Sequence, residues 1–293
     1  MTTSEHAVGS GIEPAAAEVT VPGPGSLHWR YAGDHGIYVM LVRAGLLQLM
    51  LPDLGRGVQD HSDFFSEPWE RVLRSVPQIQ GVTFDWPNGT RTARMIREYH
   101  TGIKGAQPDG RRYHALAPET YYWAHATIFD AALQFTDTFL GALSEKDKET
   151  FYAESCQVFR GYGVSDRIMP PDYRSFREYF DQVCAEQLEL TPTAKALVQM
   201  GEEPPERFPL LPQPLYRLLR KPSGKVLWWV AVGTLPPVIR DRIGASWSPR
   251  DERRYQRMCR SIGRVWPLLP SAVRYTPRAR AGFRRAGVGP AGC

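Results

Sequence analysis

The stretch Tyr121-Tyr122-Trp123-Ala124-His125-Ala126-Thr127-Ile128-Phe129 is apolar over most of its length and holds one imidazole. Read as a helix, it places His125 on the same side as Tyr121, Ile128, Phe129 and Ala132, because residues three, four and seven apart share a helix face. An imidazole in such surroundings is either a core histidine with a satisfied hydrogen bond or a ligand to a bound group that is not part of the polypeptide. Taken alone, the stretch favours the core histidine, since most buried polar groups are hydrogen-bonded within the protein.

A second segment, Arg94-Met95-Ile96-Arg97-Glu98-Tyr99-His100-Thr101-Gly102, carries three polar side chains on one helix face. Arg97, His100 and Thr101 stand at positions i, i+3 and i+4, so a guanidinium, an imidazole and a hydroxyl point the same way. Taken alone, this trio is best explained as an exposed polar face with an arginine near a helix end.

Helical periodicity dominates the rest of the chain. We expect further helices at residues 36–50, 66–77, 118 onward, 144–161, 172–190, 192–200, 223–235 and 249–266. Residues 81–88 predict a loop or short strand, and residues 103–117 and 202–214 predict connectors rich in turn residues, proline or charge. No strand-rich region emerges, so the sequence predicts an all-α, single-domain helical bundle with a cavity between helices, globin-like packing being one form.

The two ends of the chain differ from its middle in composition. Residues 1–27 predict a disordered lead, residues 28–273 the helical domain, and residues 274–293 a basic, flexible tail. The tail holds five arginines, equal to the net charge of +5: Arg274, Arg278, Arg280, Arg284 and Arg285. Such a run is typical of segments that bind nucleic acid or an anionic membrane surface. Only Tyr275 and Phe283 interleave with it, so a solvated tail without a nucleic-acid partner is favoured.

Composition also bears on the compartment. The sequence has no unbroken apolar run of about 18 residues, so it predicts no transmembrane helix. Its first 25 residues lack the basic and apolar regions of a signal peptide. The cysteines, at positions 156, 184, 259 and 293, form no Cys-x-x-Cys pair, so no zinc site or disulfide framework is indicated. We therefore expect a cytoplasmic protein.

The two histidine segments together resemble a known family. Arg-x-x-His-Thr at residues 97–101, followed by Trp-Ala-His-Ala-Thr at residues 123–127, is similar to the haem-dependent latex-clearing-protein (rubber oxygenase) superfamily, and most similar to its MpaB-like oxygenase branch. The order and spacing of further segments extend the resemblance over roughly residues 30–275. These segments are Gly57–Phe64, Glu67–Arg71, Ala117–Glu119 and Leu235–Arg240.

The resemblance implies a haem b cofactor and roles for individual residues. His125 matches the proximal histidine that binds the haem iron, while Arg97 and Thr101 match distal residues. His100 stands where the rubber oxygenases have a lysine, so it is either a distal iron ligand or an acid or base nearby. This departure means that rubber is not implied as the substrate. The branch implies dioxygen, an electron donor and a smaller apolar substrate, with isoprenoids and other alkenes as examples.

These residue types suit that chemistry. Neutral imidazole is the usual proximal ligand of haem iron, and distal donors govern what happens to dioxygen. An arginine is a fixed cation with several donors, and a histidine exchanges protons near neutral pH. The alternative that the residues leave open is a helical protein that binds haem or lipid in the same cavity without catalysis.

One further histidine has two interpretations. His61 lies just before a predicted helix start, where it either lines the cofactor pocket or serves the backbone. The structural role is favoured, because polar groups in loops so often bond backbone atoms. His28, His35 and His114 have no constellation of partners in the sequence, and the Tyr121-Tyr122-Trp123 cluster reads as core, with one ring edge available to a porphyrin.

Overall fold

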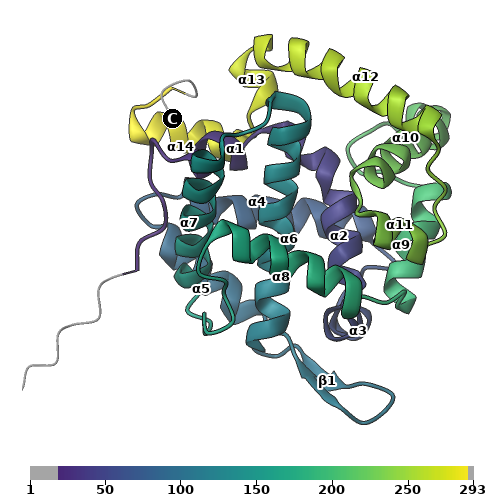
Figure 1. Ribbon diagram of the computed structural model, residues 1–293, viewed down its shortest axis with the longest axis horizontal. Helices are drawn as coiled ribbons and strands as arrows, with labels where there is room; N and C mark the ends of the chain where they lie inside the picture. The colour runs from purple at the N-terminus through teal and green to yellow at the C-terminus, as the bar shows by residue number, and fades with distance from the viewer. Residues whose placement is uncertain (1–18, 290–293) are drawn as a thin grey trace, which may run out of the picture.

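The structure, a computed structural model, describes residues 19–289, and helices make up nearly all of its regular structure (Figure 1). In chain order the helices are α1 (Leu27–Ala32), η1 (His35–Met40), α2 (Leu41–Leu49), α3 (Pro52–His61), α4 (Pro68–Phe84), α5 (Gly89–Tyr99), α6 (Pro118–Phe135), η2 (Thr136–Leu140), α7 (Glu145–Gly161), α8 (Tyr173–Glu186), α9 (Pro192–Glu202), α10 (Gln213–Thr234), α11 (Pro237–Arg242), α12 (Pro249–Val265), η3 (Trp266–Leu268), α13 (Ser271–Arg274) and α14 (Pro277–Ala286). The prediction of a mostly all-α, single-domain fold is confirmed.

Several helices begin where the sequence offers a capping side chain. The hydroxyl of Ser144 accepts a hydrogen bond from the backbone of Asp147 at the start of α7, and Ser248 and Asp251 form a reciprocal capping box on α12. Such caps satisfy amide groups that lack an intrahelical partner. These two helices therefore begin within one residue of their predicted positions.

Other boundaries differ from the prediction. Helix α4 passes through Pro77 and continues to Phe84, because the side chains of its last turn are buried and their packing offsets the hydrogen bond that the proline removes. Helix α10 begins at Gln213, ten residues earlier than expected, and contains Pro222. The connector at 103–117 holds an antiparallel hairpin, β1 (Lys104–Ala106) with β2 (Arg112–His114), which projects from the helical body (Figure 1).

Helix α6 runs through the middle of the molecule, among α2, α7 and α8 (Figure 1). Its Trp123 is fully buried, and the indole nitrogen donates a hydrogen bond to the carbonyl of Leu47 on α2 (2.9 Å). On its α7 side, Phe129 packs edge-on against Phe151. The helix that carries His125 is thus fixed on several sides by large side chains.

A buried ion cluster joins α2, α6 and α8. The guanidinium of Arg43 contacts the carboxylate of Asp130 at 2.6 Å, and the two side chains are 2% and 0% exposed. Arg177 contacts the other carboxylate oxygen at 2.8 Å, and Arg43 also donates to the carbonyl of Thr234. Two cations thus share one buried carboxylate, an arrangement in which removal of the central partner strands uncompensated charge.

Residues 19–27, the described part of the N-terminal segment, contact the helical body at several points. Residues 1–18 of the predicted disordered lead lie outside the described residues, but residues 19–27 pack on the body. Val21 is buried, the hydroxyl of Thr90 donates to the carbonyl of Val19, and the indole of Trp29 donates to the carbonyl of Pro22.

The C-terminal segment differs from the expected flexible tail. Residues 277–286 form α14, and Phe283 is buried against the rings of Trp29 and Phe84. Arg278 contacts the carboxylate of Asp85, so part of the positive charge is paired rather than solvated. Residues 290–293 lie outside the described residues.

Across residues 19–289, no individual helix has the length and apolar character needed to cross a membrane. The pair His35–Leu49 and Pro52–His61, bent by 102°, meets that criterion jointly, by length and composition only.

Candidate functional site

His125 lies on the α7 side of α6, among aromatic rings. Its Nε2 atom is hydrogen-bonded to the hydroxyl of Ser155 (2.9 Å) and to the carbonyl of the same residue (3.1 Å). The ring of Phe159 lies 5.3 Å away, and those of Tyr122 and Tyr162 each lie 6.3 Å away. Helix α7 and the residue that follows it therefore supply the hydrogen-bond partner of His125 and two of the three rings around it.

Burial keeps His125 uncharged. The pKa of its imidazole is lowered from 6.5 to about 3: burial is the main cause, the charge that His28 would carry adds to it, and the hydrogen bond to Ser155 opposes both effects. The side chain nevertheless keeps some accessible surface. At neutral pH the ring is thus a neutral imidazole, the form in which histidine binds a metal.

A second imidazole, that of the half-buried His28 on α1, packs against the same helix α7. The carboxylate of Glu154 accepts hydrogen bonds from the backbone amides of Leu27 (3.2 Å) and His28 (2.7 Å). The His28 ring is 6.0 Å from that of Phe151. Its Nδ1 atom is buried and has no hydrogen-bond partner, and burial lowers the pKa of His28 to about 4.

No sequence pattern pointed to the contact between His28 and α7. His28 and Glu154 are 126 residues apart, and a carboxylate that caps the first turn of a distant helix leaves no local motif. Ser155, which holds His125, was missed for the same reason: a lone serine within an amphipathic helix has no distinguishing pattern.

Arg97, His100 and Thr101 lie at the C-terminal end of α5. The guanidinium of Arg97 is 38% exposed and contacts Glu98 at 3.1 Å, and the exposed hydroxyl of Thr101 donates to the carbonyl of Glu98 (2.8 Å). The Nδ1 atom of His100 is hydrogen-bonded to the carbonyl of Ile96 (2.8 Å). These contacts are local to α5 and its end.

Two tyrosine rings connect this group to His125. His100 packs edge-on against Tyr121 at 5.7 Å, Tyr121 against Tyr162 at 5.4 Å, and Tyr162 against His125 at 6.3 Å. Within residues 19–289 no hydrogen bond or ring contact joins His125 directly to Arg97, His100 or Thr101. The aromatic pair therefore occupies the path between the predicted proximal and distal residues.

His61 occupies the exposed end of α3. Its Nε2 atom is hydrogen-bonded to the carbonyl of Lys104 on the hairpin (3.1 Å), and its ring lies edge-on to Tyr113. Of the two roles considered for His61, this contact corresponds to bonding a backbone carbonyl.

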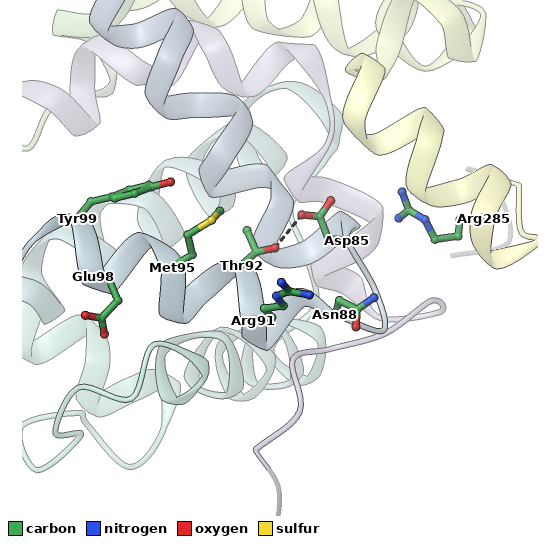
Figure 2. A pocket seen from close by; sticks show the side chains of 8 residues that line it. All are labelled: Asp85, Asn88, Arg91, Thr92, Met95, Glu98, Tyr99 and Arg285. Atoms are coloured by element: carbon green, nitrogen blue, oxygen red, sulfur yellow. Dashed lines mark hydrogen bonds between the residues drawn. The ribbon is translucent and has the colours of Figure 1, made fainter.

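A hollow of about 720 Å³ lies on the outer side of α5, between the end of α4 and α14 (Figure 2). Met95 and Tyr99 project from α5, Asp85 is hydrogen-bonded to Thr92, and Arg285 approaches from α14 (Figure 2). The hollow carries charged side chains of both signs, and His125 does not line it. Met95 and Tyr99 add apolar surface to this charged lining.

The sequence of this chain matches a family model over residues 29–264, described as "ER-bound oxygenase mpaB/B'/Rubber oxygenase, catalytic domain". The chain belongs to this family. The match contains both α5 and α6, so membership of the MpaB/rubber oxygenase family supports an oxygenase, with a small-molecule substrate and dioxygen.

Two similar proteins come from mycobacteria. Each is named an uncharacterized protein, one from Mycobacterium bovis and one from Mycobacterium tuberculosis. Each is 20% identical to this chain over 231 residues, which are 77% of this chain and 87% of the relative. No solved structure matches the chain.

Proposed function

We propose that this MpaB/rubber oxygenase family member depends on haem b and acts with dioxygen on a small apolar substrate, such as an isoprenoid or another alkene. His125 binds the haem iron in this proposal, and Arg97, His100 and Thr101 act on dioxygen and substrate. The observation that carries it is the neutral imidazole of His125, desolvated among aromatic rings on a rigid central helix.

The donor set fits a haem better than a bare metal ion. Residues 19–289 contain no group of three or more His, Cys, Asp or Glu side chains able to hold a metal ion. A haem needs fewer protein ligands, because its porphyrin holds the iron and the protein supplies axial ligands. The neutral imidazole of His125 supports that assignment.

When bound, the haem would supply the binding and activation of dioxygen. The protein fixes the imidazole that holds it. Ser155 orients the ring of His125, and Gln48 on α2 donates hydrogen bonds to the carbonyl of Ala124 (3.2 Å) and to the hydroxyl of Thr127 (2.8 Å). The turn of α6 around His125 is therefore tied to α2 and α7 together. The rings of Tyr122 and Phe159 cover part of the imidazole.

Arg97 is able to serve a reaction because its present contact is weak. Its ion pair with Glu98 is exposed, and exposed pairs contribute about 0–1 kcal/mol. Turning the guanidinium toward a bound substrate or dioxygen therefore costs little, and a fixed cation stabilises negative charge as it develops. His100 adds an imidazole at the same end of α5.

Oxygen consumption tests the proposal. Haem-loaded protein with a reductant and a panel of small alkenes and terpenoids should consume dioxygen, and His125→Ala should abolish both haem retention and consumption. Arg97→Gln should keep the haem and lose at least tenfold in rate, while His35→Ala, at a histidine of η1 bonded to the carbonyl of Val273, should match the wild type. A protein that binds dioxygen stably and converts no substrate would instead be a non-catalytic haem protein.

A further inference from the structure

Helix α12 carries a row of arginines on its outer face. The helix lies at the periphery of the molecule (Figure 1), and it turns Tyr255 and Cys259 toward the body. Arginines follow one another at intervals of three and four residues, which places them on one helix face, opposite the two buried side chains. All are exposed, and we call them the arginine stripe: Arg250, Arg253, Arg257, Arg260 and Arg264.

The positive charge of the stripe is not neutralised by the part of the chain that the structure describes. None of its arginines forms an ion pair within residues 19–289. The two acids of α12 are engaged elsewhere: Asp251 forms the capping box with Ser248, and Glu252 accepts a hydrogen bond from the indole of Trp247 (2.8 Å). Like charges three and four residues apart destabilise a helix. A bound polyanion would therefore relieve a repulsion that the folded chain leaves in place.

Exposed apolar side chains follow the stripe at its C-terminal end. Val265 is 58% exposed, Leu268 is 81% exposed and Val273, on α13, is 52% exposed. Leu268 comes four residues after Arg264, in the short helix η3 that continues α12. Along α12 itself no aromatic side chain is exposed. The surface therefore combines a cationic row with large aliphatic side chains in contact with water.

We propose that this surface docks on an anionic lipid bilayer. The arginine stripe binds headgroup phosphates, for which the planar guanidinium is suited, and the three aliphatic side chains enter the boundary between headgroups and acyl chains. A nucleic acid fits the arginines alone, because it would leave the aliphatic side chains in water and would find no exposed ring on α12 for its bases to stack on. A second copy of the chain would bring the same positive charge to the face and would be repelled.

Cosedimentation of the full-length protein with lipid vesicles tests this docking. The protein should bind phosphatidylcholine vesicles that contain about one third phosphatidylserine, should not bind vesicles of phosphatidylcholine alone, and should lose affinity as salt is added. The triple change Arg253→Gln, Arg257→Gln and Arg260→Gln should weaken binding about a hundredfold, since each cation near an anionic surface contributes about fivefold. The melting temperature should not fall, because these side chains form no ion pair within the described residues.

A matched control removes the same charge from another part of the surface. The triple change Arg160→Gln, Arg167→Gln and Arg174→Gln affects arginines that each form an exposed ion pair away from α12. It should keep the wild-type affinity for the anionic vesicles. Leu268→Ser changes no charge and should weaken binding while the dependence on salt stays, because it removes apolar contact with the bilayer.

Several results would overturn the proposal. Equal binding to both kinds of vesicle, or no binding to the anionic ones, would show that the surface does not recognise anionic lipid. Equal losses in the stripe variant and the matched control would mean that net charge, rather than α12, governs binding. If the vesicles are not bound and duplex DNA or RNA is bound in a manner that the stripe variant abolishes, the partner is a nucleic acid.

Discussion

Replacing His125 with leucine should make the protein less sensitive to acid. Burial lowers the pKa of this imidazole from 6.5 to about 3 in the folded protein, so the unfolded chain takes up a proton first as the pH falls. The stability that depends on the neutral ring is complete above pH 6.5 and is lost progressively as the pH falls toward 3. Each unit of pKa corresponds to about 1.4 kcal/mol, so the loss between pH 6.5 and pH 4 is about 3 kcal/mol.

Urea unfolding of cofactor-free protein, followed by circular dichroism at several values between pH 7 and pH 4, measures this effect. The wild type should lose free energy of unfolding more steeply than His125→Leu, by up to about 1.4 kcal/mol per pH unit. At pH 7 the variant should itself be less stable by about 1–3 kcal/mol, because it leaves the buried groups of Ser155 unpaired.

A control separates titration from packing. Phe159→Leu removes a ring that contacts His125 but adds and removes no titratable group. It should lower the free energy of unfolding at every pH and keep the wild-type slope. Equal slopes for the wild type and His125→Leu would refute the claim that this imidazole is buried in its neutral form.

Three further substitutions probe separate parts of the molecule. Asp130→Ala should lower the free energy of unfolding by about 3–5 kcal/mol, because two guanidiniums lose their shared carboxylate; a loss under about 1 kcal/mol in urea unfolding would contradict the buried cluster. Phe283→Ala should cost about 3–5 kcal/mol and expose α14 to limited proteolysis, and equal protease resistance in variant and wild type would show that α14 does not pack as described. Arg97→Gln should change the melting temperature by no more than a few degrees, since its ion pair is exposed, and a large drop would mean that Arg97 is structural.

The helical elements were predictable where local signals mark them. Ser144 and Ser248 each cap a helix, and the start of each follows from a hydroxyl placed before a run of helix-forming residues. The end of α4 was not predictable, because the buried residues after Pro77 outweigh the local effect of the proline. Long-range packing made this difference, and a sequence window does not contain it.

The pairing of the C-terminal arginines was likewise not predictable from the local sequence. Arginines at positions 274, 278 and 285 read as a solvated run, but the fold brings Asp34 and Asp85 to the first two and the carbonyl of Phe84 to the third. These partners are about 190 to 240 residues away in the chain. Charge composition indicates the number of cations, and only the fold determines which of them are paired.

Some residues of the candidate site were predictable from the sequence and others were not. His125 was identifiable because a single imidazole interrupts an apolar helix, and the spacing to Arg97 and His100 made the family recognisable. Ser155, which bonds the ring of His125, was not identifiable, since this contact depends on how α7 packs against α6. Whether Arg97, His100 and Thr101 act on the same ligand as His125 stays a prediction, with Tyr121 and Tyr162 between them.

The proposed function requires that His125 bind a haem. This binding can be read from absorption spectra of freshly purified protein, recorded before and after dithionite and after addition of hemin. We expect a Soret band that shifts on reduction, about one haem per chain, and loss of that haem in His125→Ala. A colourless protein that takes up no hemin, or a His125→Ala variant with full haem content, would contradict it.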